Sequence, residues 1–147
     1  MTRGFLRPAD LALPPGGWNS TRAKFDLSDL SAAESAGVLL QWALSRHLGA
    51  ELKRAGYTSV EAFARVNQLP NSNTLHNFFN GNRRANFEDL ALLVERLGPK
   101  AWPQPSRLAR YIEGARRRSG GEEAAGPLWS LYQGDLDAKD PWDEWGR

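Results

Sequence analysis

Apolar residues recur at three- and four-residue steps in several stretches of the chain, and this spacing is typical of one face of an α-helix. Ser31 and Glu34, three residues apart, have the spacing of a capping box at a helix start. Gly56 is a typical residue just beyond a helix end. The pattern between these signals predicts a long helix over residues 32–54. Its apolar positions are Val38, Leu39, Trp42, Leu48 and Leu52.

Four shorter segments follow with the same spacing, and we expect helices over residues 59–69, 72–80, 87–97 and 106–118. Pro70 ends the first of them, because the residue before a proline is pushed out of helical geometry. Asn80 and Gly81 end the second, and Asn86 caps the third. The sequence therefore predicts an all-α fold, a compact bundle of about five helices.

The two ends of the chain lack this periodicity. Residues 1–30 carry several Pro and Gly residues with scattered aromatic ones, which indicates an irregular N-terminal arm with apolar anchors that lies on the domain surface. Residues 119–147 form an acidic tail rich in Trp. We expect the helical domain to occupy residues 31–118. No stretch has the length of a membrane span or the pattern of a signal peptide, and cysteine is absent, so we expect a cytoplasmic protein without disulfides.

Charge divides the chain more sharply than its net value of +2 indicates. Residues 40–118 carry 13 Lys and Arg against 6 Asp and Glu, whereas residues 119–147 carry 2 against 7. A basic middle favours a polyanionic partner, although a chance variation of surface charge gives the same count. The acidic Trp-rich tail has three open interpretations: it docks on a partner protein such as RNA polymerase, folds back on the basic surface, or packs on its own domain.

The second and third predicted helices are short and joined by a tight break, and a loop with two arginines follows them. Leu75 and Phe78 are three residues apart and are expected to face the core. Asparagine side chains on the other side suit base edges, because an amide donates and accepts hydrogen bonds together. This combination is typical of a DNA-reading pair of helices.

The stretch from Thr58 to Gly98 resembles the lambda-repressor-like helix-turn-helix family, also called the xenobiotic-response-element family. The matching features are Phe63-Ala64-Arg65, Leu75, Asn80-Gly81 and the segment Leu90 to Gly98. The resemblance covers about residues 40–98. It implies double-stranded DNA as the partner, binding often as a homodimer to palindromic operators, no cofactor, and control of transcription as repressor or activator at the bacterial nucleoid. Many members are phage or prophage regulators.

The resemblance also implies site residues. Bases would be read by Ser72, Asn73 and Asn77, with His76 at the groove edge. Phosphates would be met by Asn71, Thr74, Asn82, Arg83 and Arg84. Two departures stand out: Gln68 occupies a turn position where the family has glycine, and residues 69–73 are one residue longer than the usual turn.

Other functions receive less support from the sequence. An ordinary helical bundle with a polar face is the simplest alternative, and a protein-interaction adaptor that docks on RNA polymerase or another transcription component is the main functional one. No residues supply the catalytic groups of a small DNA-processing enzyme, so we expect no enzymatic activity. We also expect no metal site, since no ligand set completes the two histidines, and we expect His47 on the surface of its helix. Arg116-Arg117-Arg118 fits flanking phosphates and a solvated helix end equally well.

Overall fold

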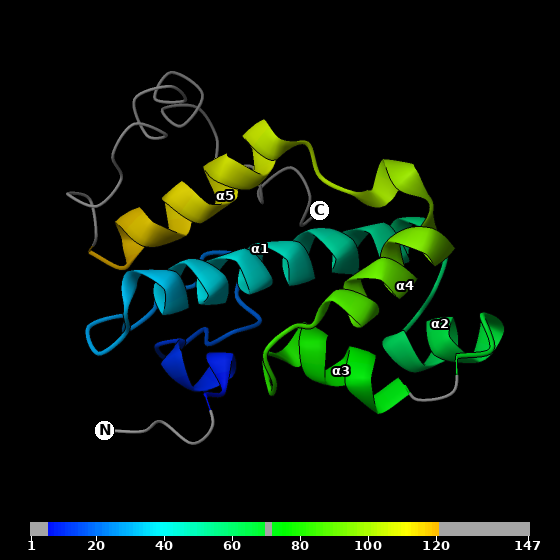
Figure 1. The fold of residues 1–147 in the computed structure, drawn as a ribbon, viewed down its shortest axis with the longest axis horizontal. Coiled ribbons are helices and arrows are strands. Elements are labelled where there is room, and N and C mark those ends of the chain that lie inside the picture. Colours follow the sequence, from blue (N-terminus) through cyan, green and yellow to red (C-terminus); the bar gives the residue numbers. More distant parts are fainter. Residues whose placement is uncertain (1–5, 70–71, 121–147) are drawn as a thin grey trace.

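The computed structural model describes residues 6–69 and 72–120, and these residues form an all-α fold (Figure 1). The helices are α1 (Ala32–Arg54), α2 (Val60–Val66), α3 (Ser72–Asn80), α4 (Phe87–Leu97) and α5 (Pro105–Arg118), with 3-10 turns at Pro8–Leu11 and Pro99–Ala101. Within the described ranges the only β pairing is an isolated bridge between Ala12 and Phe25. Four of the helices lie within one residue of their predicted bounds, whereas α2 ends at Val66, three residues before the predicted end at residue 69, because the left-handed Gln68 ends it before Pro70 is reached.

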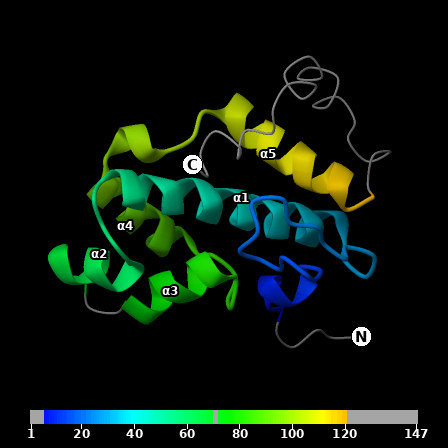
Figure 2. The ribbon, with the colours of Figure 1, turned by 180° about the vertical axis from the view of Figure 1, so that it is seen from behind.

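Helix α1 is the central element of the bundle. It begins at the predicted capping box, in which Ser31 Oγ accepts from Glu34 N and Glu34 Oε1 accepts from Ser31 N. In both views α5 lies on one side of α1 and α3 lies on the other (Figure 1, Figure 2). As a result the side chains in the middle of α1 are almost all covered by other elements.

The N-terminal half of α1 packs into one of two buried clusters. Residues 6–30 contribute Trp18 and Phe25 to it, with 4% and 2% of their surfaces exposed. Phe25 stands edge-on between the rings of Trp18 and Trp42, with ring centroids 6.0 and 5.9 Å apart. The N-terminal arm is irregular, as predicted, and two of its expected apolar anchors, Trp18 and Phe25, are part of the core.

The C-terminal half of α1 packs into the second cluster, together with α2, α3 and α4. The buried members of this cluster are Leu44, Leu48, Leu52, Phe63, Leu75, Phe78, Phe79, Leu93 and Ala101. Because three of them belong to the nine residues of α3, this helix is held firmly against α1 by its apolar side.

His47 is buried, with 3% of its surface exposed, and the expectation of a surface position was wrong. Its Nε2 lies 2.8 Å from the carbonyl oxygen of Ala101 and donates to it, and its ring lies 6.5 Å from that of Tyr111. The expectation failed because it assumed a helix with one apolar stripe, whereas α1 is covered on opposite sides. Burial lowers the pKa of His47, and the Ala101 hydrogen bond and Glu51 oppose this effect in part.

No helix in the described part of the chain is long and apolar enough to cross a membrane. The predictions for the Trp-rich tail over residues 121–147, including a contact with RNA polymerase, lie outside the described residues, as do those for residues 1–5.

Candidate nucleic-acid interface

Helix α2 is capped by Ser59, whose Oγ accepts from Ala62 N at 3.0 Å. Phe63 and Ala64 are buried, and the small side chain of Ala64 allows the helix to pack closely. The ring of Tyr57 stands edge-on to Phe63 at 5.1 Å, and the Asn67 amide donates to Phe63 O at 2.9 Å. The local contacts close the two ends of α2, and the burial of Phe63 and Ala64 holds the helix on the bundle.

The turn after α2 contains the one non-glycine residue with positive φ among the described residues, Gln68 at 56°. Gln68 N donates to Arg65 O at 3.2 Å, and Leu69 N donates to Ala64 O at 2.9 Å. This pair of bonds is the Schellman arrangement, which needs a left-handed residue at the position of Gln68. The turn thus keeps the backbone conformation that glycine adopts most easily, although glycine is absent.

Helix α3 has an apolar and a polar side. Leu75, Phe78 and Phe79 are at most 6% exposed, so the predicted core contacts of Leu75 and Phe78 are confirmed. At 100° per residue, Asn73 and Asn77 lie opposite this apolar side. Asn73 and His76 are exposed, whereas Ser72, Thr74 and Asn77 are half-buried. Ser72 falls nearer the apolar side than the two asparagines do.

Position 80 shares the face of Asn73 and Asn77, because the three asparagines are spaced by four and three residues along α3. From the sequence, Asn80 was predicted only as a helix terminator. Its place on the outward face follows from the same spacing rule that was used for the other two.

The C-terminal end of α3 is fixed by the N-terminal arm. Trp18 Nε1 donates to Phe79 O at 2.8 Å, and this hydrogen bond is buried. Ala9 N donates to Gly81 O, also at 2.8 Å. Gly81 has a φ of 69° and ends the helix, as predicted. The arm therefore holds in place a helix end that Gly81 itself determines.

Gln41 of α1 holds the loop between α3 and α4. Its Nε2 donates to the carbonyl oxygens of Phe78 and Arg83, at 3.2 and 2.8 Å, while its Oε1 accepts from Ala85 N at 2.9 Å. With 4% exposure, the Gln41 side chain is buried and three of its hydrogen-bonding positions are used. The loop that carries the two arginines is thus attached to the central helix.

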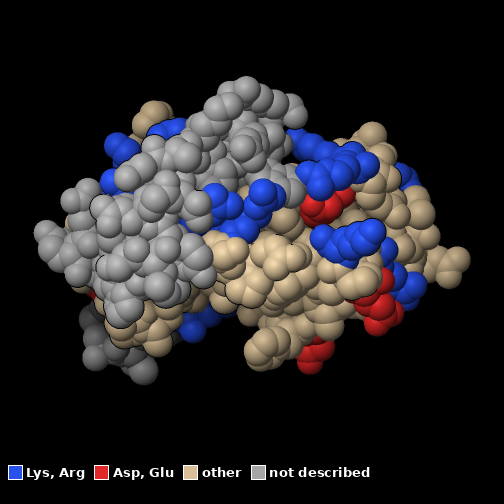
Figure 3. Space-filling view, turned by 90° about the horizontal axis from the view of Figure 1, so that it is seen from above, with Lys and Arg blue, Asp and Glu red and all other residues tan. Residues whose placement is uncertain are grey.

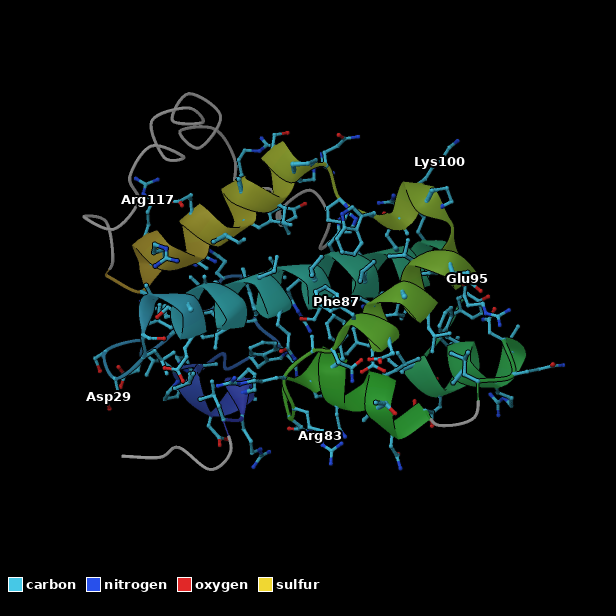
Figure 4. All side chains as sticks on the ribbon, viewed as in Figure 1. Asp29, Arg83, Phe87, Glu95, Lys100 and Arg117 are labelled. Carbon is cyan, nitrogen blue, oxygen red and sulfur yellow. The ribbon has the colours of Figure 1, made fainter. Side chains whose placement is uncertain are left out.

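The side chains of this loop differ in their surroundings. Arg83 is exposed, and it projects from the edge of the molecule that α3 forms (Figure 4). Among the described residues no carboxylate pairs with it. Arg84 Nη2 lies 3.5 Å from Glu34 Oε2 on α1. Asn82 Oδ1 accepts from Arg7 Nη2 at 3.0 Å, which brings a third arginine to the loop. Asn71 lies outside the described residues.

Arg7 was not predicted as a site residue. It is 75 residues from Asn82 in the sequence, so no local spacing could connect the two. Its place depends on the docking of the arm against the end of α3.

An acidic residue stands beside α3. Glu61 of α2 lies with its Oε1 3.2 Å from His76 Nδ1, and both side chains are about half exposed. His76 is therefore near the rim of the outward face, but it is paired with a carboxylate. A carboxylate at this place repels phosphate, so it weakens any polyanion binding at the α2 side of the face.

Helix α4 begins at the predicted cap, with Asn86 Oδ1 accepting from Asp89 N at 2.8 Å. Asp89 is 7% exposed, and burial, with a smaller effect of Glu88, raises the pKa of its carboxyl.

The arginines at the end of α5 lie on the far side of α1 from α3, where Figure 4 labels Arg117. Figure 3 looks down on this side of the molecule and shows several Lys and Arg side chains on its described part. Arg118 Nε donates to Ala23 O at 3.2 Å, and its guanidinium lies 5.7 Å from the ring centroid of Trp42. Arg118 thus holds the arm onto the bundle, and the triplet does not share a face with Asn73 and Asn77.

Comparisons of the chain with protein-family models, with curated proteins and with solved structures found no match.

Proposed function

We propose that the chain binds double-stranded DNA in a sequence-specific manner and regulates transcription, with α3 lying in the major groove. The observation that carries this proposal is the outward face of α3, on which Asn73 and Asn77 stand opposite a fully buried apolar side. Asparagine pairs with adenine through two hydrogen bonds, and a helix of this size fits the major groove.

The loop after α3 supports the proposal. Arg83 is exposed at the same edge of the molecule as α3, so it can meet a phosphate while the asparagines meet bases. Arg7 and Arg84 add positive charge nearby, and part of the Arg84 charge is offset by Glu34. These side chains supply attraction without sequence preference, whereas the amides supply the preference.

The fixed end of α3 is also what base reading requires. Trp18 and Gln41 donate to the carbonyl groups of Phe79 and Phe78 in the last turn, so the backbone that carries the outward side chains is held on the bundle. A rigid reading helix avoids the entropy cost of ordering on binding.

A gel-shift competition tests the proposal. The full chain is incubated with labelled genomic fragments at several salt concentrations, with random DNA as the competitor. We expect a small set of fragments to stay bound when random DNA is in excess, and we expect affinity to fall steeply with salt. Equal binding of every fragment would contradict sequence-specific regulation.

A protein-interaction adaptor is the second candidate, and one observation favours it: Phe87 on α4 is 88% exposed, which is unusual for a ring that is not at an interface. An adaptor would bind a transcription protein through the bundle and need no base reading. In that case Asn77→Ala would leave every DNA interaction unchanged.

A further inference from the structure

An apolar pocket of about 280 Å³ opens between the N-terminal half of α1 and the first turns of α4. Leu6 and Pro8 of the arm close one side of it. Gln41 is also part of its lining, and the same amide holds the loop that carries Arg83. The pocket is therefore adjacent to the proposed phosphate contacts. Its apolar walls on the helices are formed by Ala33, Val38, Leu40, Leu44 and Leu90.

Phe87, labelled in Figure 4, lines the pocket and has 88% of its surface exposed. Leu40 of α1 also lines the pocket and is 39% exposed. Phe87 and Leu40 thus expose apolar surface to water beside the pocket. An apolar group that covered this surface would gain free energy from the hydrophobic effect. The pocket volume is near the lower end of the range for small-molecule sites, so it suits one large side chain.

The chain itself supplies such side chains. Residues 121–147 contain Trp129, Trp142 and Trp145, and the last two stand among Asp140, Asp143 and Glu144. Tryptophan gains much from burial and prefers a site where part of the ring keeps a polar contact.

The tail starts close enough to reach the pocket. Helix α5 ends at Arg118, and Ser119 Oγ accepts from Phe25 N at 3.0 Å, which fixes the start of the tail against the arm. The 22 residue-to-residue steps from Gly120 to Trp142 span up to roughly 75 Å when extended. The whole of α1 is only about 35 Å long. A tethered segment also has a local concentration on the order of millimolar, so weak docking is enough.

The distribution of charge also favours the tail as the occupant of the pocket. Residues 1–120 carry 17 Lys and Arg against 10 Asp and Glu, whereas residues 121–147 carry 2 against 7. At the pocket itself Arg84 has a side chain that is 59% exposed and lies 3.5 Å from Glu34 Oε2, which also lines the pocket, so an acidic residue next to a bound ring would share Arg84 with Glu34.

We propose that the acidic aromatic segment around Trp142 docks in the pocket between α1 and α4 of its own chain, with the Trp142 ring against Phe87 and Leu40 and the neighbouring carboxylates beside Arg84.

Docking of this kind would make the tail a competitor of DNA, and this consequence rests on the proposed function. The carboxylates would neutralise Arg84 and repel phosphate next to Arg83. Trp142→Ala should then raise the affinity for DNA several-fold at low salt. The docking itself does not depend on DNA binding.

A spin label tests the docking in the DNA-free full chain. Because the chain has no cysteine, Gly146→Cys gives a single attachment site for a nitroxide. The proposal predicts that the label broadens the amide signals of residues 33–41 and 84–90 and leaves those of α2 sharp. Uniform broadening, no broadening, or broadening centred on another element would overturn it.

Two sets of controls distinguish docking of the tail within one chain from docking on a second copy, and test whether Trp142 and Phe87 are needed. In a mixture of isotope-labelled chain without the label and unlabelled chain with it, broadening of the pocket signals would mean that the tail docks on a second copy, which contradicts the proposal. Trp142→Ala and Phe87→Ser should each reduce the broadening in the single chain by half or more. Val66→Ser is the matched control, since Val66 is 65% exposed on α2, and it should have no effect.

Discussion

The indole ring of Trp18 occupies the space where a side chain at position 81 would begin. A Cβ built on Gly81 would lie 2.7 Å from two atoms of the ring, a distance at which something must shift. Gly81 also has a φ of 69°, which other residues adopt at a cost. The glycine therefore serves two purposes: it ends α3, and it lets the arm close over that end.

Gly81→Ala should destabilise the fold more than Gly56→Ala. Both glycines have positive φ, but a Cβ at Gly56 meets nothing within 4 Å. Gly56→Ala should cost about 1 kcal/mol through backbone conformation alone. Gly81→Ala should cost about 2–4 kcal/mol, because the ring of Trp18 must also move. Urea unfolding measures both, and equal costs would show that Trp18 does not confine position 81.

Gln68→Gly should stabilise the chain. Gln68 has a φ of 56° in the Schellman turn after α2, and glycine adopts this conformation without the clash of a Cβ. The gain is reduced by the greater freedom of glycine in the unfolded chain, so we expect about 0.5–1 kcal/mol in urea unfolding. Gln68→Ala, which keeps a Cβ, should bring no gain. A loss of stability in Gln68→Gly would mean that the glutamine side chain matters more than the backbone.

Stability should fall as pH falls below about 6.5, the ordinary pKa of histidine. Burial holds the pKa of His47 below this value, so the unfolded chain binds the proton first. The stabilising contribution is present above pH 6.5 and is lost as the pH falls toward the pKa of the folded state. Urea unfolding at about pH 7.5 and about pH 5.5 measures the loss.

His47→Gln, which keeps a donor for Ala101 O, should show a smaller loss between the two pH values. Burial raises the pKa values of Asp89 and Glu113, so their protonation favours the folded state over a pH range that extends upward from their ordinary values of 3.8 and 4.5. Protonation of these two carboxyl groups raises the free energy of unfolding, whereas protonation of His47 lowers it, and the carboxyl groups contribute equally in the wild type and in His47→Gln. The same loss in the variant as in the wild type would assign the pH dependence to other groups.

Glu61→Gln should strengthen DNA binding. The Glu61 carboxylate lies 3.2 Å from His76 beside the outward face of α3, where it repels phosphate. We expect a gain of about two- to five-fold at low salt that shrinks as salt is added, measured by fluorescence anisotropy. Glu95→Gln makes the same change of charge on the exposed part of α4, away from the α3 edge in Figure 4. Equal gains from the two variants would argue against binding at the α2–α3 face.

Local signals in the sequence were sufficient for the helices. The capping box at Ser31 and Glu34, the cap at Asn86 and the stop at Gly81 depend on residues within four positions of each other. Hydrophobic spacing also separates the two sides of α3, since a short helix on a bundle has one buried side.

Contacts between distant segments could not be predicted in this way. Trp18 meets Phe79 across 61 residues, and Arg7 meets Asn82 across 75. His47 was misassigned for a related reason: a central helix is buried on several sides, and its own spacing does not reveal which elements will cover it. Proline and glycine in the arm indicated irregular backbone, but not that the arm would fix the end of α3.

The most direct test of DNA reading by α3 is the affinity of Asn77→Ala for the preferred fragment and for random DNA, measured side by side at one salt concentration. Asn77 lies opposite the buried side of α3, and its replacement by a good helix former should leave the fold intact, which thermal unfolding checks. We predict a loss of about 1–3 kcal/mol, roughly 5- to 150-fold, on the preferred fragment, with little change on random DNA. An equal effect on both DNAs, or no effect on either, would contradict base reading by this helix.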